Sequence, residues 1–529
     1  MWTLLVLAAG LRLTASQAPG TPILGQDYWL DDGKDDLKAA LKTKLNTRVA
    51  KNVILFIGDG MSPITVTATR IYHSGETSRL VWEEFENIGL LKTYCNDKTV
   101  PDSSVTASAM YSGIKGNRGT MGTDGTVPRS DCLRSLDSSR RTTSNFLHAQ
   151  MAGKATGIVT NTRVTHATPG AAYAHSAHRD WECDGALPES AAACKDIARQ
   201  LIEDEPGRSL NVIMGGGRQG LVSNHRTTPF DPLTSSCNRT DSRDLIQEWI
   251  DRQQNMSAKF AYVDNTGSLK NVDTANVHNL LGIFSNGHFP HNHYRNKTSD
   301  LAQPSLELMA TTAVKVLNNN PNGFLLMVEG GMIDMGHHKG RARLALDETV
   351  EMNKAVNSTL HLLQELGIKD DTLFIVTSDH NHGMTINGYP DRGKSILGIA
   401  DKSEHDGANY TTLMYTISGT ESFQFEVVNG QAKRREPSQD DTESWDYHQQ
   451  ALVINDEGKH EGGDVNVYAT GPMAHLFHRV HEQSYVAHVV QYAAQIGLYS
   501  DRNVISSFSP PHLASAIVLL LSILIVRFL

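Results

Sequence analysis

The chain has 529 residues, enough for one large domain with insertions or for two or three ordinary domains. Its formal net charge is -10, with neither acids nor bases strongly clustered, which argues against nucleic-acid binding because that function needs a basic stripe. An anionic substrate remains compatible with this charge, because a bound metal ion can dominate the field of a mildly acidic surface.

The chain begins with a stretch typical of a secretory signal. Residues 1–16 are mostly apolar, and small residues follow them. An amphipathic helix is predicted near residues 35–47, and a buried strand over residues 53–57. Asp59 comes directly after this strand between two glycines, which allow the backbone to approach a ligand closely. A helix is predicted over residues 64–73.

Ser103 lies at or near the start of the next predicted helix. Pro101 and Asp102 mark a stop and a cap, and the small residues over 104–113 suit a helix packed closely on a sheet. Backbone N–H groups and the helix dipole favour a phosphate or an ionised oxygen at such a position. From the residues alone, Ser103 is either part of an anion site or a simple N-cap.

The middle of the chain supplies further polar side chains after short strands. A strand over residues 156–160 leads to His166 and Thr168, and Arg179 follows soon after. The elements predicted next are a helix near 191–202, a strand at 211–214, and helices at 245–251 and 306–317.

A second predicted strand is followed by an acidic residue, as the strand before Asp59 is. The apolar strand over residues 324–328 is followed by Glu329. Asp334 and His338 are four residues apart, a spacing that places both on one face of a helical turn. A long amphipathic helix is predicted over residues 341–366.

The strand over residues 373–376 leads into three residues of metal-ligand type, Asp379, His380 and His382. Strand patterns then weaken over residues 388–459, which predicts an insertion that ends just before His460. A last strand at 465–469 and a closing helix at 484–496 complete the pattern.

The C-terminus matches a glycolipid-anchor signal. Residues 513–529 are mainly apolar, and the candidate attachment residues Asn503, Ser506 and Ser507 lie upstream. Removal of residues 506–529 is therefore expected. A spanning helix is the alternative, although about 17 residues is at the short limit for one.

Glycosylation sequons and cysteines agree with a secreted route. Five sequons begin at Asn238, Asn255, Asn296, Asn357 and Asn409. The five cysteines fit one or two disulfides in an oxidising compartment, and the odd number leaves one thiol unpaired or intermolecular.

These patterns predict an α/β fold with a large, mostly parallel central sheet flanked by helices, and with an inserted subdomain at residues 388–459. Ligands collect at the carboxyl ends of the strands of such a sheet. The acids and histidines there supply enough mixed ligands for two zinc ions and an oxygen-rich position that suits magnesium. Paired metals of this kind are typical of phosphoryl chemistry. The alternative is that each group is a satisfied polar residue of the core.

Seven segments in series resemble the animal alkaline phosphatases. They are Val53-Ile-Leu-Phe-Ile-Gly-Asp59, Val100-Pro-Asp102-Ser103, Thr162-Arg-Val-Thr-His166-Ala-Thr168, Val328-Glu329-Gly-Gly, Ile333-Asp334-Met-Gly-His-His338, Thr377-Ser-Asp379-His380-Asn-His382 and His460-Glu-Gly-Gly-Asp-Val465. The resemblance extends from about residue 27 to residue 499. It implies a catalytic domain over residues 17–505, with residues 388–459 as a crown-like subdomain.

The resemblance also implies two zinc ions and one magnesium ion per subunit. The implied ligands are Asp334, His338 and His460 for the first zinc, Asp379, His380 and one oxygen of Asp59 for the second, and the other oxygen of Asp59 with Thr168 and Glu329 for magnesium.

Four further roles follow from the same resemblance. Ser103 would be the nucleophile and Arg179 a bidentate clamp on the phosphate. His166 and His382 would lie beside the metal ligands without binding metal themselves. The implied activity is hydrolysis of many small phosphomonoesters through a phosphoserine intermediate, releasing phosphate and an alcohol at alkaline pH. The implied form is a homodimer, lipid-anchored on the extracellular face of the plasma membrane.

This chain departs from the family pattern at several positions. Met335 replaces a usual histidine, and Ser104 replaces Gly or Ala. Ser285 stands where vertebrate members have a Glu, and Gln303 stands near where they have an Asp, so their fourth, calcium-binding site is doubtful here. Cys132 and Cys194 match the family's disulfide positions, whereas Cys95, Cys183 and Cys237 stay unassigned.

Two other functions compete with phosphomonoester hydrolysis. A phosphodiesterase or sulfatase of the same superfamily would use Thr or a modified Cys or Ser in another motif. A surface protein without activity would have lost ligands, and every expected ligand is present.

Overall fold

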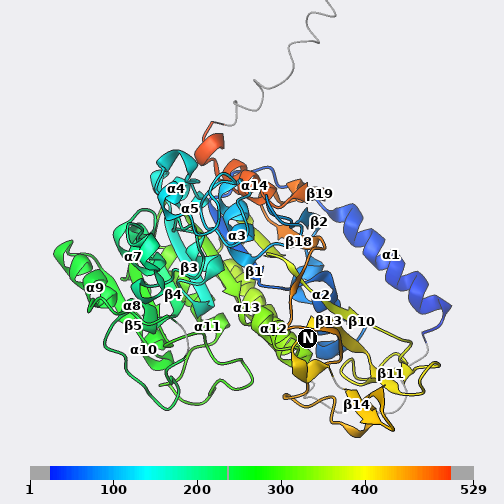
Figure 1. The fold of residues 1–529 in the computed structure, drawn as a ribbon. Helices are drawn as coiled ribbons and strands as arrows, with labels where there is room; N and C mark the ends of the chain where they lie inside the picture. The colour runs from blue at the N-terminus through cyan, green and yellow to red at the C-terminus, as the bar shows by residue number, and fades with distance from the viewer. Residues whose placement is uncertain (1–23, 235–236, 424, 502–529) are drawn as a thin grey trace, which may run out of the picture.

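The computed structural model describes residues 24–234, 237–423 and 425–501 (Figure 1). The expected secretory signal, the expected anchor signal and the candidate attachment residues Asn503, Ser506 and Ser507 lie outside these ranges. Within them, no helix combines the length and apolar character that crossing a membrane requires.

A ten-stranded sheet forms the centre of the molecule. Its strands, in spatial order, are β19 (Arg479–Glu482), β2 (Asn87–Lys92), β18 (Val465–Thr470), β8 (Thr372–Ser378), β1 (Asn52–Gly58), β7 (Phe324–Gly330), β3 (Ala155–Arg163), β4 (Val212–Gly216), β6 (Asn279–Ile283) and β5 (Phe260–Val263). The strands from β8 to β5 all run parallel, and β18 is antiparallel to both of its neighbours. The predicted α/β fold with a mostly parallel sheet is confirmed.

Both faces of the sheet are buried, as the apolar runs of β1 and β8 predict. Because successive side chains point to opposite faces, Leu55 joins one hydrophobic core and Phe56 the other. The helices that contribute to the first core are α3 (Ser103–Ser112), α5 (Asn145–Met151), α7 (Ile197–Glu203), α9 (Leu245–Asn255) and α14 (Tyr485–Ala494). Those that contribute to the second are α2 (Pro63–Ser74), α10 (Thr266–Lys270), α11 (Leu306–Leu317) and α13 (Ala342–Glu365).

Short helices and small sheets complete the fold, and two of these helices also contribute to the cores, through Leu221 in the first and Ile333 in the second. The short helices are α4 (Cys132–Ser135), α6 (Ala167–Gly170), α8 (Arg218–Leu221) and α12 (Met332–His338). Within and beside the predicted insertion, β10 (Met384–Ile386), β13 (Leu413–Ser418) and β16 (Ala451–Ile454) form one sheet. Two-stranded sheets are made by β11 (Ile399–Lys402) with β12 (Asn409–Thr411), by β14 (Phe425–Val428) with β15 (Gln431–Arg434), and by β17 (His460–Glu461) with β9 (Asn381–His382).

Two helix predictions were wrong in their bounds. The N-terminal helix α1 spans Gln26–Lys42 instead of 35–47 and projects from the body of the protein (Figure 1). None of its residues is buried, so no core pattern fixes its ends. The helix expected near 191–202 is α7, which begins only after Asp196. The Asp196 carboxylate accepts a hydrogen bond from the Arg199 N–H at 2.8 Å and caps the helix there.

Two disulfides join segments on one side of the molecule. One links Cys132 to Cys194, and the other links Cys183 to Cys237, which the sequence left unassigned. Cys95 is a free, buried cysteine.

Candidate active site and metal centre

Three neighbouring strands bring acids to one edge of the sheet. Asp59 follows β1, Asp379 follows β8, and Glu329 ends β7. These strands are adjacent in the order β8-β1-β7, and Ile57 of β1 is in register with Glu329. The three carboxylates, of which Asp59 precedes the other two by 270 residues or more, therefore converge at the carboxyl edge of the sheet.

A first cluster of side chains gathers beside α12. Asp334 Oδ2 lies 3.2 Å from His338 Nε2. His460 Nε2 lies 3.2 Å from that same His338 nitrogen and 3.5 Å from Asp334 Oδ1. His382 Nε2 is 2.9 Å from Asp334 Oδ1. The four side chains place ligand atoms within 4.8 Å of one another, as a metal site requires.

A second cluster contains Asp59, Asp379 and His380, and all three side chains are fully buried. His380 Nε2 lies 3.2 Å from Asp379 Oδ2 and 3.4 Å from Asp59 Oδ1. The Asp379 Oδ1 atom is held by the backbone N–H groups of Gly60 and His380, at 3.0 and 2.8 Å. One carboxylate oxygen is thus fixed by the backbone, and the other faces the cluster.

A third cluster combines Asp59 and Glu329 with His166. The Thr160 and Thr162 hydroxyls donate hydrogen bonds to Glu329 Oε2, which orients the carboxylate. Thr168 lies in α6, two residues from His166, and is fully buried.

The donor set fits metal ions. Asp59 Oδ2 and Glu329 Oε1 are buried and accept no hydrogen bond from any described residue, an arrangement that is costly unless a cation binds there. Burial, together with the charges of Asp379, Asp334 and Glu329, raises the pKa of Asp59 well above its ordinary value. A bound cation removes this conflict by compensating the crowded carboxylates.

Other groups in the clusters are also perturbed. Burial raises the pKa of Glu329 to about 7, against the hydrogen bonds that Thr160 and Thr162 donate to it. Burial opposes the charged form of His338, but the adjacent Asp334 carboxylate outweighs it and raises that pKa to about 9. Such shifts are typical of functional sites.

Ser103 stands beside the second cluster, as the first residue of α3. Its Oγ lies 3.2 Å from His380 Nε2 and 3.5 Å from Asp59 Oδ1. The side chain of Asp102, the residue before it, does not cap the helix. The backbone N–H groups at this helix start are therefore directed toward the same region as Ser103 Oγ.

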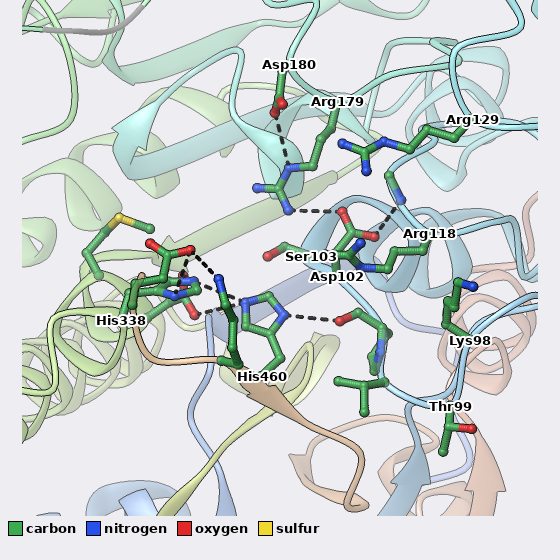
Figure 2. A pocket seen from close by; sticks show the side chains of 17 residues that line it. Lys98, Thr99, Asp102, Ser103, Arg118, Arg129, Arg179, Asp180, His338 and His460 are labelled. Carbon is green, nitrogen blue, oxygen red and sulfur yellow. Dashed lines mark hydrogen bonds and ion pairs between the residues drawn. The ribbon is translucent and has the colours of Figure 1, made fainter. Parts of the chain in front are cut away.

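Arg179 extends over the same cavity and is held from two sides (Figure 2). Its Nη1 donates a hydrogen bond to Asp102 Oδ2 at 3.0 Å, and its Nη2 lies 3.1 Å from His166 Nε2. Burial opposes the guanidinium charge, but Asp102, Asp180 and Asp59 outweigh it and hold the pKa of Arg179 above its ordinary value.

The structure therefore brings together every site residue that the sequence singled out. His166 and His382, expected to lie beside the metals, place ring nitrogens as close to the clusters as the expected ligands do. The sequence interpretation made Asp102 a helix cap, a role that its side chain does not take, and gave no role to Thr160 and Thr162. In the structure Asp102 holds Arg179, and the two threonines hold Glu329. Asp102 adjoins the predicted nucleophile, and that proximity was the available signal.

An α/β sheet with acids and histidines converging at its carboxyl edge, beside a serine at a helix start, defines the class of metal-dependent hydrolases. The comparisons with known proteins name the family. Residues 50–496 match the family described as alkaline phosphatase. The chain belongs to the alkaline phosphatase family, and it is a metal-dependent hydrolase of phosphate monoesters.

Two relatives illustrate the match in sequence. The chain is 42% identical to the tissue-nonspecific alkaline phosphatase of Homo sapiens over 505 residues, which covers 93% of each chain. It is 41% identical to an alkaline phosphatase of Gadus morhua, covering 89% of this chain and 97% of the relative.

Solved structures agree with the fold. The alkaline phosphatase of Thermus thermophilus superposes with a TM-score of 0.59 at 20% identity, covering 86% of this chain and 93% of the other. That of the Antarctic bacterium TAB5 superposes with a TM-score of 0.56 at 21% identity, covering 86% and 100%.

Proposed function

We propose that the chain hydrolyses a broad range of small phosphomonoesters through a phosphoserine formed on Ser103. The observation that carries the proposal is the position of Ser103 Oγ, 3.2 Å from His380 Nε2 and 3.5 Å from Asp59 Oδ1 at a helix start. These two side chains belong to a candidate metal cluster, so the hydroxyl lies where a bound cation would act on it.

We assign two zinc ions and one magnesium ion to the three clusters, on the basis of donor type. Asp334, His338 and His460 would hold one zinc, and Asp379 and His380 with Asp59 would hold the other. Asp59, Glu329 and Thr168 offer only oxygen, which suits magnesium. When bound, the metals supply positive charge that lowers the proton affinity of a neighbouring hydroxyl and neutralises phosphate oxygens.

The protein's own groups account for the remaining steps. Arg179, held by Asp102, donates paired hydrogen bonds to the phosphoryl oxygens. Ser103 Oγ attacks phosphorus, the bond from phosphorus to the alcohol oxygen breaks, and the alcohol leaves. Water then cleaves the phosphoserine and releases phosphate. Because these contacts fall on the phosphoryl group, many alcohols are accepted. The alkaline pH dependence is proposed from the family alone.

The surroundings of Ser285 support the absence of a fourth, calcium site. The Ser285 hydroxyl donates to Asp231 Oδ1 at 3.2 Å, and Arg218 forms a buried ion pair with the same carboxylate. Gln303 donates to the backbone oxygen of Phe230. The buried guanidinium of Arg218 thus already supplies the positive charge that Asp231 requires.

We further propose a glycosylated homodimer anchored by a lipid on the extracellular face of the plasma membrane. The exposed helix α1 supports a partner, because it carries exposed Trp29, Leu37 and Leu41. A monomeric mass by light scattering would contradict the dimer. Release of the protein from membranes by a phosphatidylinositol-specific phospholipase tests the anchor, and retention would favour a spanning helix.

The central test is hydrolysis of p-nitrophenyl phosphate, which a chelator should abolish and zinc plus magnesium should restore. Ser103→Ala should abolish the phosphoenzyme and leave metal content unchanged. Ser112→Ala is the matched control, because that serine lies in the last turn of the same helix, where its hydroxyl bonds to the Ser108 carbonyl. A metal-loaded wild type without activity would refute the proposal, and loss of zinc in Ser103→Ala would refute the role of Ser103.

A further inference from the structure

Ser104 follows the proposed nucleophile and replaces the Gly or Ala of the family pattern. Its side chain is fully buried in the first turn of α3. Serine near a helix start commonly bonds to the free backbone N–H groups there. The Ser104 hydroxyl instead donates a hydrogen bond to Asp102 Oδ2 at 2.8 Å. A position without a side-chain donor in the family pattern thus contacts the carboxylate that holds Arg179.

The Asp102 carboxylate is buried and has donors on both oxygens. Asp102 Oδ1 accepts a hydrogen bond from the Gly119 N–H at 2.8 Å. Asp102 Oδ2 accepts from two groups, the Ser104 hydroxyl at 2.8 Å and Arg179 Nη1 at 3.0 Å. Burial opposes the charge of Asp102, but Arg179, the Gly119 N–H and the Ser104 hydroxyl outweigh it and hold its pKa below the ordinary value. The carboxylate cannot rotate without breaking at least one of these bonds.

Asp102 is the principal anchor of the Arg179 guanidinium (Figure 2). The exposed carboxylate of Asp180 lies 3.9 Å from Arg179 Nε, which is too far for a hydrogen bond. His166 Nε2 lies 3.1 Å from Arg179 Nη2 and carries no negative charge. A change at Asp102 is therefore transmitted to the group that would bind the phosphate.

Two effects of the Ser104 hydroxyl on Arg179 act in the same direction. The hydrogen bond lowers the basicity of Asp102 Oδ2, so this oxygen leaves more of the guanidinium charge for a phosphoryl oxygen. The bond also fixes the carboxylate and, through it, Arg179 Nη1, so less freedom is lost when the guanidinium binds phosphate. Loss of the hydroxyl should weaken phosphate binding by both routes.

We propose that Ser104 is a positioning residue that strengthens the hold of Arg179 on phosphate by fixing Asp102. This inference rests on the proposed function and adds a residue to it. The Ser104 hydroxyl is directed to Asp102 and does not contact the substrate in this scheme. Its predicted contribution is tighter binding of phosphate and phosphate esters, and not faster bond breaking at Ser103.

The test is Ser104→Ala in the metal-loaded full chain, with inorganic phosphate and p-nitrophenyl phosphate as probes. The dissociation constant of phosphate, measured by titration calorimetry, and KM for the ester should each rise about 3- to 10-fold, a part of the free energy of one charge-assisted hydrogen bond. The kcat value should not fall, because the interaction serves substrate and transition state alike. A lowered kcat with an unchanged phosphate constant would indicate general disturbance of the site and overturn the inference.

An Asp102→Ala background separates positioning from packing. Because the effect of Ser104 passes through Asp102, Ser104→Ala should change the phosphate dissociation constant less than about 1.5-fold in that background. The same 3- to 10-fold rise in both backgrounds would mean that Ser104 acts without Asp102, and this would also overturn the inference. Metal content measured on each variant shows that the clusters are loaded equally.

Ser112→Ala is the matched control, because it removes a hydroxyl that bonds to the Ser108 carbonyl in the last turn of the same helix, and it should leave the phosphate constant unchanged. An unchanged phosphate constant in Ser104→Ala would overturn the role of Ser104 alone. A metal-loaded wild type that hydrolyses no ester would overturn the proposed function, and one that also binds no phosphate would overturn this inference with it.

Discussion

Replacement of Arg179 should change phosphate binding and the stability of the protein by different amounts, and the two effects can be measured separately. In the structure Asp102 fixes Nη1 of the guanidinium at 3.0 Å, and His166 lies 3.1 Å from Nη2. Arg179→Lys keeps the charge but loses the paired geometry, whereas Arg179→Gln loses both.

The magnitudes follow from charge-assisted hydrogen bonds, each worth about 1.5–3 kcal/mol. Arg179→Lys should lose one such bond to the phosphoryl group and lower kcat/KM for p-nitrophenyl phosphate about 30-fold. Arg179→Gln should lose two, about 3–6 kcal/mol, and lower kcat/KM by about two to four orders of magnitude. The inhibition constant of inorganic phosphate should rise in parallel.

Stability should respond differently. Arg179→Gln leaves the buried Asp102 carboxylate without its cation, although the Gly119 N–H and the Ser104 hydroxyl still donate to it at 2.8 Å. We expect a loss of about 3 kcal/mol in the free energy of unfolding, at the low end for a broken buried pair. The double variant Arg179→Ala/Asp102→Ala should recover much of that loss in chemical denaturation without recovering activity.

The decisive outcome concerns Arg179→Lys. If this variant retains its metals and keeps kcat/KM within about twofold of wild type, the paired geometry of Arg179 is irrelevant and the reasoning fails. Metal content measured on each variant excludes indirect loss of the clusters.

Three further predictions concern metals, pH and cross-links. Metal binding should release protons, and more of them near pH 6 than near pH 8. At pH 8 His338, with its pKa raised to about 9, must lose a proton, and near pH 6 Glu329, with its pKa raised to about 7, loses another. Calorimetry in buffers of different ionisation heat measures this release, and equal release at both pH values would contradict the prediction. Chelation should lower the melting temperature, and less so near pH 5 than near pH 8. Without metal, the ionised Glu329 carboxylate destabilises the fold; this penalty is complete above the folded pKa of about 7 and fades toward the ordinary pKa of 4.5. The same loss at both pH values in scanning calorimetry would argue against this. Cys183→Ser should cost about 4 kcal/mol in the free energy of unfolding, since the disulfide to Cys237 closes a loop of 54 residues, and chemical denaturation showing less than about 1 kcal/mol would contradict the estimate.

Much of the sheet could be predicted because its central strands are buried on both faces. The apolar runs at 53–57, 324–328 and 373–376 correspond to β1, β7 and β8, each two or three residues longer in the structure. The strands β2, β5 and β19 escaped prediction because they are exposed in part, and such strands give neither a continuous apolar run nor a clean alternation. The strand β6 is mostly buried but also escaped prediction, because Gly282 interrupts its short apolar run.

The residues of the site could be predicted from their type and from their position at strand ends, but the contacts among them could not. Asp59, Glu329 and Asp379 are each marked by a preceding apolar strand. No such mark in the sequence identifies Thr160 and Thr162, because the contact of their hydroxyls with Glu329 depends on β3 lying next to β7. Pairings of strands distant in sequence are not encoded in local pattern.

The two-residue ladder between β9 and β17 has a consequence for how the protein can vary. It pairs His382 with His460 and Asn381 with Glu461, closing the segment between them at its base. Loop closure costs only a logarithmic increment with length, so that segment can lengthen, shorten or be exchanged while both histidines stay in place. The Gly458 carbonyl near the end of this segment lies 2.7 Å from His338 Nδ1 and must be kept, so exchange of the outer part of the segment is the natural route to new surface properties.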